Sequence, residues 1–190
     1  MTYTCTIDTP LGAMTAAAKD EGLVGLWFIG QRYYPHQRAD WVHEPDHPVF
    51  ASIRAYLGRY FSGDAAVLDV RLIPRGSSFQ KAVWNLLLRI PMGQVTTYGQ
   101  IATCLERTLG LTSMSAQAVG GAVGRNPISI LIPCHRVVGS RGALTGYAGG
   151  LEKKATLLRI EKVDLAGTGL RRSALMSGQL PLTEQPCLEK

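Results

Sequence analysis

The sequence predicts an α+β protein of two parts, and three observations support this prediction. Apolar segments of strand length, separated by turn residues, fill residues 3–29. Apolar residues at helical spacing begin near residue 48 and recur after residue 77. The charge balance also changes, because residues 1–75 hold seven Lys/Arg and eight Asp/Glu whereas residues 76–165 hold ten and four. We therefore expect one domain over 1–75 and another over 76–165.

The first part is typical of a small antiparallel sheet with one helix. The turn at Pro10 to Gly12 and the stretch 19–22 separate two or three strands. A helix is expected from Pro48 to Phe61, followed by a strand over 67–73, since apolar residues recur every three or four positions from Phe50 to Tyr60. The histidines of residues 31–47 lack neighbours at metal-ligand spacing, so this segment is interpreted as a loop.

The second part is predicted to be mostly helical. A serine at 77 or 78 can cap a helix that ends before Pro91. Short helices over 98–105 and 115–124, joined by a linker around Gly110, have the layout of a helix-turn-helix. The second of them is almost entirely Ala, Gly, Ser and Val, which suits either tight internal packing or close approach to the minor groove of a nucleic acid.

Composition limits the class of protein. The chain has 190 residues, of which 46% are hydrophobic, and a net charge of +6. No apolar run is long enough for a membrane span, and the N-terminus lacks the features of a secretory signal, so we expect a cytoplasmic protein with no membrane partner. The basic second part suits a polyanionic partner. Residues 166–190 show no periodic pattern and are expected to form a flexible tail.

The chemistry is concentrated in residues 126–150. An apolar run, 128–132, reads as a strand that leads through Pro133 into Cys134, His135 and Arg136. A histidine and a positive charge favour the thiolate that a nucleophilic cysteine needs. Neighbouring residues of a strand face opposite ways, so the cysteine and the histidine cooperate only across a turn or a bridging water. A cysteine nucleophile and a packed core thiol both fit these residues.

Two further features bear on this site. The helix after Gly150, with Leu151, Ala155 and Leu158 on one face, brings Glu161 near its end, where a carboxylate could orient the imidazole. None of the four cysteines has a partner at CxxC spacing, which argues against a zinc ribbon or a dithiol redox site.

The segment IPCHRVV, preceded by NPISI and followed by TGYAGG, resembles the active-site signature of the O6-alkylguanine-DNA alkyltransferases. The similarity extends through FQKAVWNLLLRIPMGQVTTYGQIA, AVGGAVGRNP and LEKKATLLRIE, and it covers about residues 77–162. The TPLG hairpin is similar to the start of the family's N-terminal domain. The resemblance implies a ribonuclease-H-like first domain and a second domain with a winged-helix-like helix-turn-helix.

The implied activity is DNA repair by direct damage reversal. The alkyl group of O6-alkylguanine (or of O4-alkylthymine) in double-stranded DNA passes irreversibly to Cys134 after base flipping, and the protein is used once. His135 matches the residue that deprotonates the cysteine through a water, Glu161 the carboxylate that orients this histidine, and Asn126 the residue that braces the turn. Tyr98 matches the tyrosine that rotates the nucleotide out of the duplex and protonates the leaving guanine.

Substrate and DNA contacts follow from the same resemblance. The carbonyl of Val137, with that of the cysteine, reads the guanine amine, and the loop that closes over the base contains Tyr147, Ala148 and Gly149. The slim helix in the minor groove presents Ser115, Ala116, Ala118 and Gly120. Gln117 stands where the family usually has an arginine, and we expect Arg125 to compensate. Ser140 is a further expected DNA contact.

No metal or organic cofactor is expected, because the implied transfer to sulfur requires none. Zinc is not expected either, because the zinc ligands of some family members are not matched beyond Cys5. We expect a monomer in solution. Two other functions fit part of the pattern: a Cys-His hydrolase, which would need an oxyanion hole, and a non-catalytic binder of alkylated DNA, whose known representatives lack the acceptor cysteine. The repair function also requires the sulfur to be reachable by a flipped nucleotide.

Overall fold

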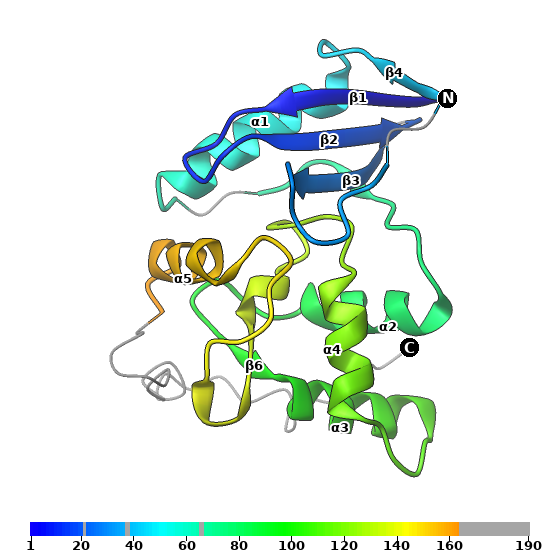
Figure 1. Ribbon diagram of the computed structural model, residues 1–190, viewed down its shortest axis with the longest axis vertical. Coiled ribbons are helices and arrows are strands. Elements are labelled where there is room, and N and C mark those ends of the chain that lie inside the picture. Colours follow the sequence, from blue (N-terminus) through cyan, green and yellow to red (C-terminus); the bar gives the residue numbers. More distant parts are fainter. Residues whose placement is uncertain (21, 37–38, 65–66, 164–190) are drawn as a thin grey trace. The chain divides into compact units, whose positions relative to one another are not determined.

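The computed structural model describes residues 1–20, 22–36, 39–64 and 67–163. The chain divides into two compact units, and Figure 1 shows their helices and strands coloured by position in the sequence. The first consists of Met1–Arg75 with Pro127–Ser129, and the second comprises Gly76–Asn126 and the chain from Ile130 onward. The α+β class is confirmed. The predicted flexible tail, residues 166–190, lies outside the described residues.

The first unit contains a five-stranded sheet, whose strands lie in the order β4-β1-β2-β3-β5. Its strands are β1 (Thr2–Ile7), β2 (Met14–Lys19), β3 (Gly22–Phe28), β4 (Trp41–His43) and β5 (Arg71–Leu72). The three long strands pair antiparallel, as the sequence predicts, and the two short outer strands pair in parallel. The expected strand over 67–73 is therefore shorter than predicted, and the expected loop over 31–47 contains β4.

Helix α1 (Pro48–Phe61) lies along one face of this sheet (Figure 1) and contacts β2. A proline in the first turn suits the start of a helix, and the His47 side chain accepts a hydrogen bond from the Val49 N–H. The buried side chains include all four that the helical spacing predicts, namely Phe50, Ile53, Leu57 and Tyr60. Burying such a side chain stabilises the fold by about 1.5–3 kcal/mol.

Residues 127–129 add a short segment to the edge of β3. The Leu26 N–H donates to the Pro127 carbonyl at 2.9 Å, and the Ser129 N–H donates to the Leu26 carbonyl at 2.8 Å. The predicted strand over 128–132 is wrong, because only Ile128 forms an isolated bridge and Ile130 has a φ of 70°. A left-handed conformation at a β-branched residue interrupts an extended run at a cost of about 1–3 kcal/mol.

The second unit is built from helices with well-formed ends. Helix α2 (Ser78–Leu87) begins with a capping box between Ser77 and Gln80, and α3 (Tyr98–Leu109) begins with the same device between Thr97 and Gln100. Helix α3 is longer than predicted and ends at Gly110 in the left-handed region. Helices α4 (Ala116–Gly124) and α5 (Leu151–Ile160) complete the set, and α3 packs against α4 as expected for a helix-turn-helix.

None of the helices within the described ranges has the length and apolar character needed to cross a membrane.

Trp84 joins two helices of the second unit. Its side chain is 1% exposed, and its indole N–H donates to the Ala122 carbonyl of α4 at 3.0 Å. We expect Trp84→Phe to lower the free energy of unfolding by about 1–2 kcal/mol, because the hydrogen bond and part of the buried ring area are lost. Urea unfolding measures this change. Trp41→Phe, at a half-buried position of β4, is the control, and an equal loss there would contradict the explanation.

Candidate active site

Cys134, His135 and Arg136 form one turn of 3-10 helix. Pro133 precedes the turn, the Cys134 N–H donates to the Ile132 carbonyl at 2.7 Å, and the Arg136 N–H donates to the Pro133 carbonyl at 3.0 Å. The three polar residues are therefore not part of a strand, and the constraint that would turn the cysteine away from the histidine does not apply. Strand β7 (Val137–Val138) follows directly and pairs in parallel with β6 (Thr96–Thr97).

The sulfur of Cys134 is buried and hydrogen-bonded. The residue is 4% exposed, and Asn126 Nδ2 donates to Sγ at 3.1 Å and to the Ile132 carbonyl at 2.7 Å. Burial raises the pKa of the Cys134 thiol, while the bond from Asn126 and the positive charge of Lys154 act in the opposite direction. The thiol form prevails at neutral pH, so a reaction at this sulfur needs a base.

His135 is oriented by a charged partner. Its Nε2 lies 2.7 Å from Glu161 Oε1, and both side chains are fully buried. Burial alone would raise the pKa of Glu161, but hydrogen bonds and charges from His135 and Arg136 lower it to about 2. The carboxylate is thus ionised, which assigns the imidazole hydrogen to Nε2. Burial lowers the pKa of His135, so the ring is neutral and its Nδ1 can accept a proton.

Arg136 holds the other side of the same carboxylate. Its Nε donates to Glu161 Oε2 at 2.8 Å and its Nη2 donates to Oε1 at 2.9 Å, while Nη1 donates to the Ile90 carbonyl. A bidentate guanidinium fixes a carboxylate in one orientation. The sequence prediction treats Arg136 only as a nearby positive charge and misses this role. Its place beside His135 in the Cys-His-Arg triplet was the available signal.

Tyr98 is the first residue of α3, and its hydroxyl reaches the loop between β7 and α5. The hydroxyl donates to the carbonyls of Gly146, at 3.3 Å, and Thr145, at 3.4 Å. A Cβ on Gly146 would lie 2.9 Å from the tyrosine oxygen and would displace it, and the φ of 54° at this position also favours glycine. Burial, followed by the charge of Cys134, raises the pKa of Tyr98. The phenol therefore keeps its proton and can act as a donor.

The three predicted loop residues, Tyr147, Ala148 and Gly149, are half-buried. The ring of Tyr147 meets the ring of His135 edge to face, with centroids 6.5 Å apart. Val137, the other predicted substrate contact, is fully buried in β7. The structure thus brings Tyr147 and Val137 next to the turn of Cys134.

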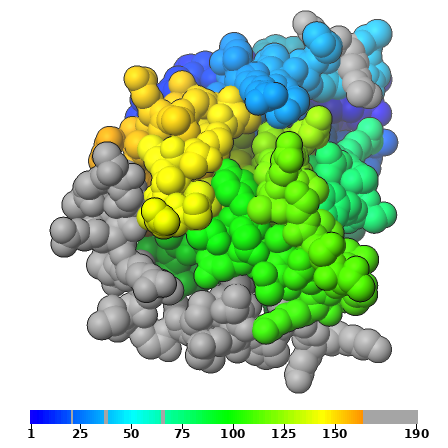
Figure 2. All heavy atoms as spheres, turned by 60° about the horizontal axis from the view of Figure 1, so that its bottom comes forward, coloured from blue at the N-terminus to red at the C-terminus, as the bar shows by residue number. Residues whose placement is uncertain are grey.

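Helix α4 has a buried face and an exposed face. Val119, Ala122 and Val123 are buried, whereas the predicted DNA contacts Ser115, Ala116, Gln117, Ala118 and Arg125 are exposed. Gly120 is half-buried, and a Cβ there would lie 3.8 Å from the ring of Tyr98. Figure 2 shows α4 (yellow-green) beside α3 (green), with the yellow segment that contains exposed Ser140 on the same face. The buried face is therefore consistent with tight internal packing, and contact of the exposed face with a nucleic acid stays a prediction.

Lys154 is a second residue that the sequence prediction misses. It is 0% exposed, and its charge acts on both Cys134 and His135. It lies four residues before Leu158 on the predicted apolar face of α5, where a lysine is out of place. Leu151, by contrast, is 46% exposed, so the start of this predicted face is wrong.

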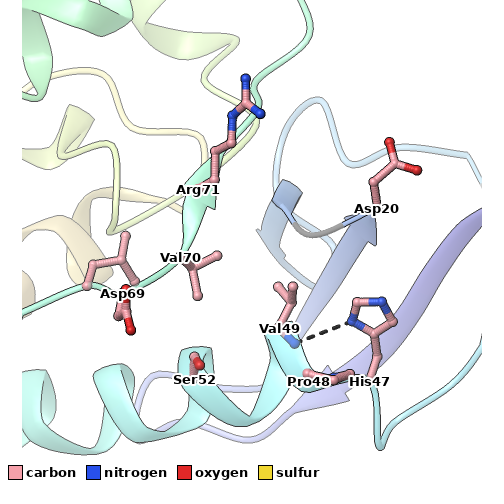
Figure 3. A pocket seen from close by; sticks show the side chains of 9 residues that line it. Asp20, His47, Pro48, Val49, Ser52, Asp69, Val70 and Arg71 are labelled. Atoms are coloured by element: carbon pink, nitrogen blue, oxygen red, sulfur yellow. Dashed lines mark hydrogen bonds between the residues drawn. The ribbon is translucent and has the colours of Figure 1, made fainter.

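A separate cavity belongs to the first unit. A hollow of about 600 Å³ in the first unit lies between the start of α1 and the region of β5, and Asp20, Asp69 and Arg71 are among the residues that line it (Figure 3). It contains no cysteine, and its His47 already accepts a hydrogen bond from Val49. Within the described residues no three His, Cys, Asp or Glu side chains form a group that could hold a metal ion.

Comparisons with known proteins match both units. A model of the 6-O-methylguanine DNA methyltransferase ribonuclease-like domain matches residues 1–74, and a model of the DNA-binding domain of the same family matches residues 78–163. The methylated-DNA–protein-cysteine methyltransferase of Mycolicibacterium paratuberculosis is 44% identical over 157 residues, which are 83% of this chain and 90% of that protein. The Haemophilus influenzae protein of the same name is 37% identical over 162 residues, which are 85% of this chain and 87% of that protein.

A solved structure agrees with these matches. The crystal structure of Mycobacterium tuberculosis OGT in complex with DNA is similar with a TM-score of 0.74 and 40% sequence identity, over 84% of this chain and 93% of that chain. The resemblance identified in the sequence is confirmed. The chain belongs to the 6-O-methylguanine DNA methyltransferase family.

Proposed function

We propose that this protein repairs DNA by transferring the alkyl group of O6-alkylguanine in a duplex to Cys134, once per molecule. The observation that carries this proposal is the set of contacts at one turn. Asn126 donates to the cysteine sulfur, and the adjacent His135 is bound to an ionised Glu161. The names of the relatives, which specify methylated DNA and a protein cysteine, support the same reaction.

His135 serves as the base. Its Nε2–H donates to Glu161, which leaves Nδ1 to take the proton of Cys134 through a bridging water. The positive charge that then develops on the imidazole is stabilised by the carboxylate. Asn126 stabilises the thiolate at the same moment, because its hydrogen bond to Sγ favours the charged form.

The transfer step exchanges one bond for another. The thiolate of Cys134 attacks the alkyl carbon, the sulfur–carbon bond forms, and the bond from that carbon to O6 breaks. Guanine leaves with the electron pair and takes up a proton from Tyr98. The proton that His135 took from the thiol then passes through water to the Tyr98 phenolate, so that overall one proton moves from the sulfur to guanine. The product is a thioether, which water does not hydrolyse. No step returns the sulfur to its starting form, so each molecule acts once.

Access to the sulfur requires movement of both partners. Cys134 is 4% exposed, so most of its surface is covered in the free protein and a nucleotide reaches it only after a rearrangement. Guanine O6 is likewise enclosed in the base stack, and base flipping exposes it. We propose that the flipped base displaces the half-buried loop at Tyr147 to Gly149, while the exposed face of α4 occupies the minor groove. The protein acts where its DNA is, in the cytoplasm.

Intact mass after incubation with a duplex containing O6-methylguanine tests this function. We expect a stable gain of one methylene mass on the Cys134 peptide. Cys134→Ser should show no gain and should still bind the duplex, because sulfur supplies the nucleophile and contributes little to the fold. Cys5→Ser, at another buried cysteine, is the control and should transfer normally. Tight binding without an adduct would indicate a non-catalytic binder, and repeated turnover of an acyl substrate a hydrolase.

Tyr98→Phe should slow methyl transfer by about a hundredfold with little change in duplex affinity, because the leaving guanine loses its proton donor. Single-turnover kinetics with labelled duplex measures the rate. Tyr33→Phe, at an exposed position of the first unit, is the matched control. An unchanged rate in Tyr98→Phe would remove the tyrosine from the transfer step.

Stability should fall as the solution becomes acidic. The pKa of Glu161 is lowered from 4.5 to about 2, so its contribution is complete above 4.5 and is lost as the pH falls toward 2. His135, whose pKa is lowered from 6.5, acts in the same direction because the unfolded chain takes up its proton first. Urea unfolding at about pH 7 and about pH 3 measures the loss. Glu161→Gln should be less stable than wild type at neutral pH and should lose less stability on acidification. The same pH dependence in both proteins would show that the Glu161 carboxylate does not cause the acid sensitivity.

A further inference from the structure

Lys154 is a buried cation with no role among the transfer steps proposed above. Its side chain is 0% exposed on α5, whereas its sequence neighbour Lys153 is half-buried. A lysine is almost never fully buried unless its ammonium group is paired, because the loss of hydration is costly. The hydrogen-bond partners of the Lys154 ammonium group therefore indicate its role.

Three carbonyl groups receive the hydrogens of the ammonium. Nζ donates to the Gly146 carbonyl at 3.1 Å and to the carbonyls of Val137 and Thr145. An ammonium has three hydrogens, and these bonds use all of them. Val137 follows the turn of Cys134, while the other two residues belong to the loop that precedes α5. One side chain thus ties the loop to the end of the cysteine turn.

The same two loop carbonyls are the acceptors of Tyr98. Its hydroxyl donates to Thr145 and Gly146 from α3, while Lys154 donates to them from α5. The position of the proposed proton donor therefore depends on carbonyl groups that the lysine holds. Movement of these carbonyls on loss of the ammonium would also move the acceptors that orient the tyrosine.

The positive charge of the Lys154 ammonium group also acts on the Cys134 sulfur. Among the described residues, Glu161 forms salt bridges with His135 and Arg136, and Lys154 takes part in neither of them. The three partners of the ammonium are neutral, so its charge is balanced only by groups further away. Burial lowers the pKa of Lys154 to about 8, and a negative charge on Cys134 acts against this change. The lysine is thus mostly charged at neutral pH and favours the thiolate, while it disfavours a proton on His135.

We propose that Lys154 is a positioning residue for alkyl transfer, whose ammonium group fixes the loop at Thr145 and Gly146 and stabilises the thiolate of Cys134. The proposal rests on the proposed function, since it deepens the role of the same site. This role is distinguishable from a purely structural one. A residue that only fills space would leave the acidity of the Cys134 sulfur unchanged.

The closing experiment measures the acidity of Cys134 without DNA. Wild type, Lys154→Met, Lys154→Arg and Lys153→Met are treated with iodoacetamide over a range of pH, and modification is followed on the Cys134 peptide by mass spectrometry. We expect Lys154→Met, which keeps the length and removes the charge, to raise the apparent pKa of Cys134 by about one unit or more. Lys154→Arg should keep most of the acidity, since its charge remains, and Lys153→Met should match wild type.

Transfer from O6-methylguanine duplex is measured on the same proteins. Lys154→Met should be slower by about tenfold or more at neutral pH, with duplex affinity close to wild type. Lys154→Arg should also be slow, because a planar guanidinium cannot donate to the same three carbonyls. Wild type without any transfer would contradict the proposed function, and the iodoacetamide profile would still decide the role of Lys154. An iodoacetamide profile of Lys154→Met that matches wild type overturns the proposal, even if transfer is slow. If Lys154→Met does not fold, Lys154→Arg decides. Slow transfer with retained acidity of Cys134 in Lys154→Arg supports the proposal, and normal transfer overturns it.

Discussion

Glu161 carries a full negative charge at a position that is 3% exposed, and its partners decide the geometry around it. Such a charge is tolerated only when donors surround it, and removal of one donor leaves a costly unpaired group. The donors here are His135, the Nε and Nη2 atoms of Arg136, and the Gly93 N–H at 3.5 Å. The remaining Arg136 nitrogen, Nη1, donates to the Ile90 carbonyl. A single carboxylate therefore holds the end of α5, the cysteine turn and the segment after α2 in one arrangement.

Helix α5 has a second buried charge of opposite sign. Lys154 lies within the helix and Glu161 follows its last residue, and each binds groups on a different side of Cys134. The carboxylate orients the proposed base, and the ammonium holds the loop that faces Tyr98. The helix thus acts as the rigid support of the site, although none of its side chains is proposed to touch the alkyl group. A rigid support of this kind is what positions reacting groups with the accuracy that catalysis needs.

The sequence predicts the regular elements better than the interruptions between them. Helix α1 is found at its predicted limits because its apolar residues repeat cleanly after Pro48. The run 128–132 is predicted to be a strand because it is apolar, but a buried segment is apolar whatever its backbone conformation. The positive φ of Ile130 and the pairing of Pro127 with β3 depend on contacts far away in the sequence, which no local pattern contains.

The candidate site shows the same division. The sequence around Cys134 left both a turn and a bridging water open, and the family resemblance named the partners of the cysteine, whose roles stay predictions. The motif did not identify Arg136 as a bidentate partner or Lys154 as a buried cation, because hydropathy treats both as surface residues. An isolated charge within a helical apolar stripe is the one local signal that could have found the lysine.

The capping box at the start of α3 has a consequence for recognition. Thr97 and Gln100 satisfy each other's backbone groups in the free protein, and Tyr98 is the first residue of the helix that they begin. The backbone of the tyrosine is therefore ordered before any nucleotide arrives. Ordering a residue on binding costs about 1–2 kcal/mol of conformational entropy, and a preformed helix end avoids that cost. Under the proposed function, contacts of Tyr98 with an extrahelical base would then contribute to affinity without first having to fold the segment that makes them.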